Sequence, residues 1–162
     1  MNKPQNFGKK YWTKTSFFGI YDGHGAKCAD FLRDSLYKLI FSDENYRDNV
    51  TVAIKNGFMK AENEFLNNYA LDKNNNMNII DRSGSCAVVI IIVDNKIYIE
   101  NVGDSRAILS LNYGNEYLIV TEDHKPSIEK EKARILKKGV KFIKLKRQLL
   151  GLKMKRSMDK SY

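Results

Sequence analysis

The residues best suited to chemistry lie together near the start of the chain. Residues 16–26 read SFFGIYDGHGA, which places Asp22, Gly23 and His24 directly after a short apolar, aromatic run typical of a buried strand. A carboxylate is a hard oxygen ligand, and a glycine lets the backbone turn sharply and bring its carbonyl close to a cation. Histidine is a titratable proton donor. The segment favours a magnesium or manganese site; a plain turn with a surface histidine is the alternative.

Two later stretches extend this pattern. Residues 83–110 read SGSCAVVIIIVDNKIYIENVGDSRAILS, and residues 121–139 read TEDHKPSIEKEKARILKKG. With FFGIYDGHG, they resemble in the same order three signatures of the metal-dependent protein serine/threonine phosphatases of type 2C. The resemblance implies hydrolysis of phosphoserine and phosphothreonine in phosphoprotein substrates, assisted by two magnesium or manganese ions.

The resemblance also implies roles for individual residues. Asp22 would be the carboxylate that bridges the two ions, and the carbonyl of Gly23 would be a further metal ligand. His24 would be the acid that protonates the departing serine or threonine oxygen. Asp104, in the GDSR segment, matches a position linked to an additional, weaker metal site. A structural aspartate that hydrogen-bonds within its own tight turn is the alternative for Asp104.

Other parts of the family pattern are missing from this sequence. The family carries an acidic metal ligand and a phosphate-binding arginine before its first strand, whereas no Asp, Glu or Arg precedes Asp22. It also takes aspartates from later motifs that this sequence does not contain. We therefore expect a weak metal site and little activity in this chain. The Asp123–His124 pair is interpreted as structural, capping a helix start.

The basic charge is concentrated near the C-terminus. The net charge of the chain is +9, and residues 125–162 contain 14 Lys and Arg against 3 Asp and Glu. Such a segment can contact phosphopeptides, anionic lipid or nucleic acid, or can be a solvated helix face. It lacks periodic aromatic residues, so nucleic acid is not the expected partner. Two alternatives to an active phosphatase stay open: a catalytically dead pseudophosphatase that serves as a binding module, and an anion or nucleic-acid binder that uses the basic tail.

Length and composition predict one domain. The chain has 162 residues, of which 43% are hydrophobic. Family catalytic domains are longer, so the sequence resembles roughly the N-terminal half of one. We expect a lead-in loop at 1–15, the partial phosphatase-like domain at 16–145 and a basic tail at 146–162. No apolar run is long enough for a membrane span or a signal core, and the two cysteines are interpreted as reduced core residues. These features predict a cytoplasmic or nuclear monomer.

Hydrophobic periodicity predicts an α+β fold. Residues 26–41 and 48–69 have helical spacing, with Asn49 or Thr51 as a cap, and a third helix is expected from Pro126–Ser127 to Gly139. Residues 87–93, 96–102, 106–111 and 117–121 have strand patterns joined by short turns, which predicts an antiparallel meander. A further strand is possible at 140–145. With the resemblance, this predicts an antiparallel β-sheet, part of a two-sheet β-sandwich, flanked by helices.

Overall fold

The computed structural model describes residues 14–71, 78–140, 143–144 and 160–161. The chain divides into two compact units, one that ends at Asp123 and one that begins at His124, and each is described by itself. The chain is α+β with antiparallel strand pairing, as the sequence predicts. The lead-in through residue 13 and most of the predicted basic tail lie outside the described residues.

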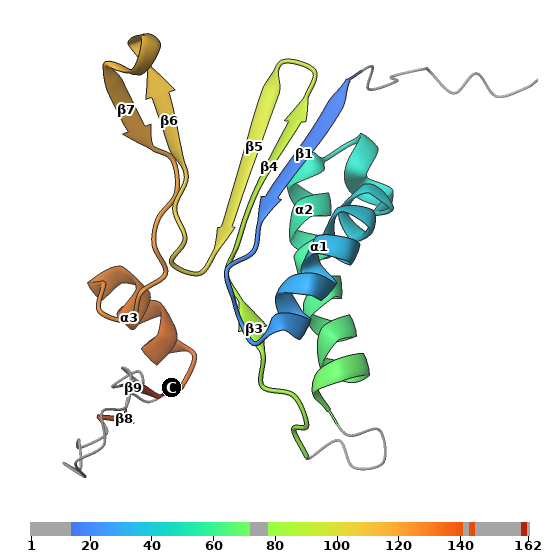
Figure 1. The fold of residues 1–162 in the computed structure, drawn as a ribbon, viewed down its shortest axis with the longest axis vertical. Coiled ribbons are helices and arrows are strands. Elements are labelled where there is room, and N and C mark those ends of the chain that lie inside the picture. Colours follow the sequence, from blue (N-terminus) through green and yellow to red (C-terminus); the bar gives the residue numbers. More distant parts are fainter. Residues whose placement is uncertain (1–13, 72–77, 141–142, 145–159, 162) are drawn as a thin grey trace, which may run out of the picture. The chain divides into compact units, whose positions relative to one another are not determined.

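A three-stranded antiparallel sheet forms the centre of the first unit (Figure 1). Its order is β1 (Thr15–Ile20), β4 (Ala87–Val93) and β5 (Lys96–Val102). The central strand β4 is the β-branched run AVVIIIV, whose residues suit a pleated surface that is covered on both sides. Two short strands, β2 (Gly23–His24) and β3 (Gly84–Ser85), also pair with each other.

Two helices cover one face of this sheet (Figure 1). The helix α1 (Ala26–Phe41) has the predicted bounds, and α2 (Val50–Phe65) begins after the predicted cap Asn49, whose side chain accepts a hydrogen bond from the Val52 N–H. The predicted second helix continues as a π-helical turn, η2 (Leu66–Ala70). The buried cluster joins both helices, the short helix η1 (Glu44–Arg47) and the helix-facing residues of β4: Leu36, Ile40, Tyr46, Val50, Ala53, Ile54, Ala61, Val89, Ile91 and Val93.

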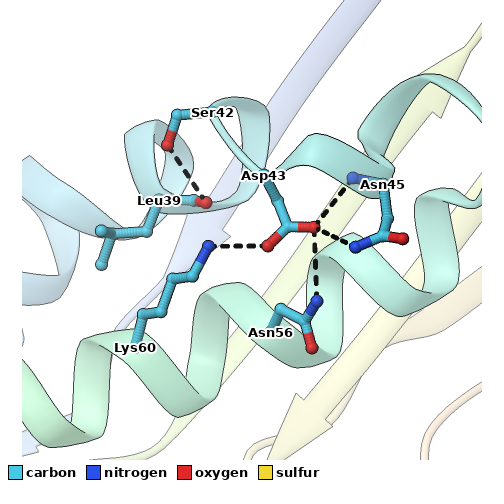
Figure 2. Close-up of polar contacts among 6 residues, drawn as sticks. All are labelled: Leu39, Ser42, Asp43, Asn45, Asn56 and Lys60. Atoms are coloured by element: carbon cyan, nitrogen blue, oxygen red, sulfur yellow. Dashed lines mark hydrogen bonds and ion pairs between the residues drawn. The ribbon is translucent and has the colours of Figure 1, made fainter.

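A buried carboxylate joins the end of α1 to α2 (Figure 2). The side chain of Asp43 is 2% exposed and forms an ion pair with Lys60 at 2.7 Å. Its other oxygen accepts hydrogen bonds from the backbone N–H and side chain of Asn45 and from the side chain of Asn56. The Lys60 ammonium and these donors hold the pKa of Asp43 well below its usual range. Because a buried charge is tolerated only when it is paired and hydrogen-bonded, this network fixes the turn between the helices.

The opposite face of the sheet is uncharged and largely uncovered. Strand alternation places Phe18 and Ile20 of β1 and Ile97 of β5 on this face, and they are 58%, 69% and 58% exposed. The predicted buried strand at β1 is therefore wrong for this face, because only Phe17 packs against the helical core. An apolar face of this kind is what one layer of the expected β-sandwich presents to the other layer.

The predicted four-stranded meander is also wrong. Strand β6 (Ile108–Leu111) pairs with β7 (Glu116–Ile119) across the short helix η3 (Asn112–Gly114), and among the described strands β6 has no pairing with β5. After β5, Gly103 adopts a φ of +106° and turns the chain away. The side chain of Asn101 donates hydrogen bonds to the carbonyls of Gly103 and Glu122, so a side chain links the end of β5 to the segment that follows the β6–β7 hairpin.

The second unit contains the third predicted helix, α3 (Glu129–Lys137). It begins later than predicted, after Ile128, and Gly139 follows its end with a φ of +80°. The strand expected at 140–145 is described only as the two residues of β8 (Ile143–Lys144), which pair with β9 (Lys160–Ser161). Across the described ranges, no helix combines the length and apolar character that crossing a bilayer requires.

Candidate active site at the end of the uncovered sheet face

One continuous register places Asp22 and His24 on the same face of the sheet. The β1–β4 ladder ends at Ile20 opposite Val88, the N–H of Cys86 donates to the Asp22 carbonyl at 2.8 Å, and His24 lies opposite Gly84. Alternation therefore puts Asp22 and His24 on the side of Phe18 and Ile20, away from the helices.

Tyr21 confirms this assignment. It packs against the helical core, on the opposite side from Asp22, and burial raises its pKa to about 12. The phenol therefore stays neutral and does not share the proton chemistry of the candidate site. Within the described ranges, the Asp22 carboxylate forms no hydrogen bond or ion pair, and its residue is exposed. A carboxylate in this state keeps both oxygens available for a cation.

The turn in this motif is at Gly25, and not at Gly23 as the sequence suggested. Gly25 has a φ of +73°, whereas Gly23 is a strand residue paired with Ser85. The Cys86 hydrogen bond makes Asp22 and Cys86 a bonded pair, so the next pair, Gly23 and Ser85, is a non-bonded one. The carbonyl of Gly23 consequently points away from β3, which is the orientation that a metal ligand needs.

Gly84 gives His24 the room that its ring occupies. A Cβ placed on Gly84 would lie 2.6 Å from the His24 Cε1 atom, a separation that real structures do not show. The imidazole therefore lies over Gly84, and a larger residue at this position would require the ring to move. The SGSC segment and the DGHG segment, which are far apart in the sequence, therefore lie side by side at this side chain.

The start of α1 is anchored by the same pair of segments. Gly25 offers no side-chain cap, and the Ser83 hydroxyl accepts a hydrogen bond from the Cys28 N–H at 3.2 Å instead. Asp81 accepts the Ser83 N–H and forms an ion pair with Lys27 at 2.9 Å. Hydrogen bonding by Ser83 and then by Lys27 holds the pKa of Asp81 at about 2. The hydrogen bond from the Cys28 N–H to Ser83 therefore stabilises the start of α1, which directly follows the segment that contains Asp22 and His24.

Asp104 is brought to Cys86, the residue opposite Asp22. The Cys86 thiol donates a hydrogen bond to Asp104 Oδ1 at 3.2 Å. Asp22, His24 and Asp104 therefore lie at the same end of the sheet. The alternative for Asp104, a carboxylate that bonds only its own turn, does not describe this contact.

Asp123 does not cap a helix as the sequence suggested. Its carboxylate accepts two hydrogen bonds from the Arg106 guanidinium, at 3.0 and 2.8 Å, and is 6% exposed. The Arg106 pairing is bidentate, the strongest form of this contact. The GDSR and EDH segments are thus tied together at the base of the β6–β7 hairpin, and the structural interpretation of Asp123 stands with a different partner.

The donor set fits a hard cation in kind but is small. Two carboxylates and a carbonyl are the oxygen ligands that Mg²⁺ and Mn²⁺ prefer. Within the part of the chain that the structure describes, no three His, Cys, Asp or Glu side chains gather closely enough to hold a metal ion. The residues present can therefore supply part of a metal centre.

An apolar cavity lies on the other side of this segment. It has a volume of about 480 Å³, and its walls include Cys28, Leu32, Phe58 and Phe65 from the helices and Ser83–Ser85 from the sheet side. Asp22, His24 and Asp104 are not among its lining residues. The cavity is therefore lined by other residues than the candidate site.

The family model described as Protein phosphatase 2C matches residues 2–158. The chain belongs to the protein phosphatase 2C family. This confirms the resemblance that the three motifs carry.

Individual relatives agree with this assignment. Protein phosphatase 2C homolog 2 of Hypocrea jecorina (strain QM6a) is 33% identical over 138 residues, which cover 84% of this chain and 30% of that protein. Protein phosphatase 1B of Rattus norvegicus is 38% identical over 138 residues, covering 76% and 34%. The solved serine-threonine phosphatase 2C of Toxoplasma gondii has a TM-score of 0.63 and 21% identity, covering 81% of this chain and 47% of that one, and supports the fold. The chain spans about a third of the curated relatives it matches.

Two residues around the candidate site have roles that the sequence alone does not predict. The sequence predicts Cys86 to be a reduced core residue, whereas it is half-buried and forms hydrogen bonds with both Asp22 and Asp104. Ser83 has no predicted role in the sequence analysis, yet its hydroxyl caps α1 from 55 residues away. The available signal was the register: if β1 pairs with β4, Cys86 must lie opposite Asp22.

Proposed function

We propose that this chain carries part of the catalytic centre of a metal-dependent phosphatase that hydrolyses phosphoserine and phosphothreonine in proteins. The observation that carries the proposal is the register that places Asp22 and His24 on one face of the sheet, with Asp104 linked to it through Cys86. Family membership supports the reaction type, and the hard oxygen donors support magnesium or manganese.

Each residue has a distinct task in this proposal. When bound, a pair of Mg²⁺ or Mn²⁺ ions lowers the pKa of water so that hydroxide is available at neutral pH. Asp22 would hold the ions by its carboxylate and Gly23 by its outward carbonyl, while Asp104 would serve a further, weaker position. His24, held over Gly84, would donate a proton to the serine or threonine oxygen as it leaves. Water would supply further ligands.

The test uses the 162-residue chain with Mn²⁺ and p-nitrophenyl phosphate. We expect Mn²⁺-dependent turnover that Asp22→Asn lowers at least about tenfold, because even residues that merely support a metal ligand are worth about ten- to a hundredfold. Asp34→Asn is the matched control: it removes an exposed carboxylate on α1 and should leave turnover unchanged. Equal rates for wild type and Asp22→Asn would refute the proposed role of Asp22.

A binding module without catalysis is the second candidate. The small donor set favours it, because the described residues do not complete a metal centre. In that case the chain would bind a phosphoprotein, and a phosphoserine peptide would bind without release of inorganic phosphate at any Mn²⁺ concentration. The free thiols of Cys28 and Cys86 support a reducing location, cytoplasmic or nuclear, for either candidate.

A further inference from the structure

Cys86 contacts the two candidate metal ligands that come from different parts of the sequence. Its backbone N–H donates to the Asp22 carbonyl at 2.8 Å, and its thiol donates to the Asp104 Oδ1 at 3.2 Å. Sulfur hydrogen bonds are longer than those of oxygen, so the second distance is a true contact. One residue therefore joins the DGHG segment to the GDSR segment.

The backbone around Asp104 is shaped to accept this thiol. Gly103 has a φ of +106°, a conformation that residues with a Cβ rarely adopt. A Cβ on Gly103 would also lie 2.4 Å from the Cys86 Sγ atom. The thiol thus occupies the space beside Gly103, and the next residue, Asp104, presents its carboxylate to it. The positive-φ turn at Gly103 and the carboxylate of Asp104 therefore both lie against the Cys86 sulfur.

We propose that Cys86 is a positioning residue that fixes the Asp104 carboxylate for cation binding at the Asp22 end of the sheet. This inference rests on the proposed function. A thiol is a weak, neutral donor, so it orients one carboxylate oxygen without neutralising the charge that attracts a cation. A serine at this position could donate the same hydrogen bond, whereas an alanine could not.

The hydrogen bond itself is tested by Raman spectroscopy of the S–H stretch. The chain has two cysteines, so Cys28→Ser leaves Cys86 as its single thiol. In this background we expect Asp104→Ala to move the S–H band to higher wavenumber, because the thiol loses its acceptor. Asp34→Asn should leave the band in place. A band that does not respond to Asp104→Ala would overturn the proposal without any reference to metal.

The effect on cation binding is tested by titrating the chain with Mn²⁺ alone and following free Mn²⁺ by electron paramagnetic resonance. We expect Cys86→Ala to weaken binding about three- to tenfold, the range of one hydrogen bond, and Cys86→Ser to restore most of it. If Cys86 acts through Asp104, Cys86→Ala should add nothing in the Asp104→Ala background. An undiminished loss in that background would contradict the proposal, because Cys86 would then act through another group.

The two experiments separate this inference from the function on which it rests. If Mn²⁺ binding is insensitive to Asp22→Asn, the proposed metal centre fails in this chain, and the Raman result alone decides whether Cys86 holds Asp104. If binding depends on Asp22 but the S–H band ignores Asp104, the metal centre stands and the role of Cys86 is refuted. Circular dichroism of each variant checks that the fold is retained.

Discussion

The two faces of the β1–β4–β5 sheet are built from similar residues and have opposite surroundings. On the helix-facing side, Val89 and Ile91 are 0% exposed, whereas Phe18 and Ile97 on the other side are each 58% exposed. Both faces are rich in aliphatic and aromatic side chains. Burial is therefore decided by the layer that packs on a face and not by its hydrophobicity.

The residues that stabilise the fold and the residues of the candidate site therefore lie on different faces of the sheet. The helix-facing side contains the buried cluster and the Asp43 network, while Asp22, His24 and Asp104 lie at the end of the uncovered side. A change on the first face should act on the free energy of unfolding. A change at the end of the second should act on cation binding.

The largest expected effect comes from the centre of the covered face. Ile91→Ala removes a side chain that is 0% exposed, and it leaves a cavity under α1 and α2. We expect a loss of about 2–5 kcal/mol in the free energy of unfolding. Urea unfolding followed by circular dichroism measures this loss. A change below about 1 kcal/mol would mean that the two faces do not differ in the way described.

A smaller effect with a defined pH dependence is expected at Asp43. The folded-state pKa of this carboxyl lies below that of an unfolded Asp, so its contribution is fully present above about pH 4 and is lost as the pH falls. Asp81, with a pKa of about 2, adds a loss over the same acidic range. Asp43→Asn should lower stability at pH 7 and flatten its decline between about pH 4 and pH 2.

The measurement is the urea midpoint at a series of pH values, for wild type and Asp43→Asn. Asp34→Asn is the matched control, because its carboxylate is exposed and pairs with Arg33 on the helix surface. Parallel pH profiles for wild type and Asp43→Asn would contradict the assignment. They would mean that the carboxylate contributes nothing specific to the folded state.

The smallest effect is expected on the uncovered face. Ile97→Ala removes the same atoms as Ile91→Ala, but from a side chain that is 58% exposed. We expect a loss below about 1 kcal/mol, the span of strand preferences at exposed positions. Urea unfolding of the two variants side by side gives the difference directly. Equal losses would show that the uncovered face is packed in solution.

Local patterns in the sequence predicted the helices well. The apolar spacing of residues 26–41 predicted α1 with its observed bounds, and Asn49 is one of the two predicted caps of α2. These features depend on residues close together in the chain, so local periodicity and capping chemistry determine them. The three motifs gave the family for a related reason, since each motif is a local string of residues.

Features that depend on distant segments were predicted poorly. The sequence pattern joined β5 to β6 in one meander, because short turns normally connect paired strands. In the structure the positive φ at Gly103 and the Asn101 side chain interrupt that pairing. The contacts of Cys86 were not predicted for the same reason. They follow from the pairing of β1 with β4, and these two strands are separated in the sequence by both helices. For the candidate site, the sequence motifs identify Asp22, His24 and Asp104, and the pairing of the strands shows that they lie at the same end of the sheet.

The serine that caps α1 has a consequence for how the chain folds. Ser83 and its partner Cys28 are separated by 55 residues, and β1 likewise pairs with β4 across both helices. Neither contact can form until the second segment has been synthesised and the intervening chain has closed into a loop. Such sequence-distant contacts raise the contact order and slow folding. During synthesis, therefore, β1 cannot pair until β4 has been made, and the end of the sheet that carries Asp22 and His24 can form only then.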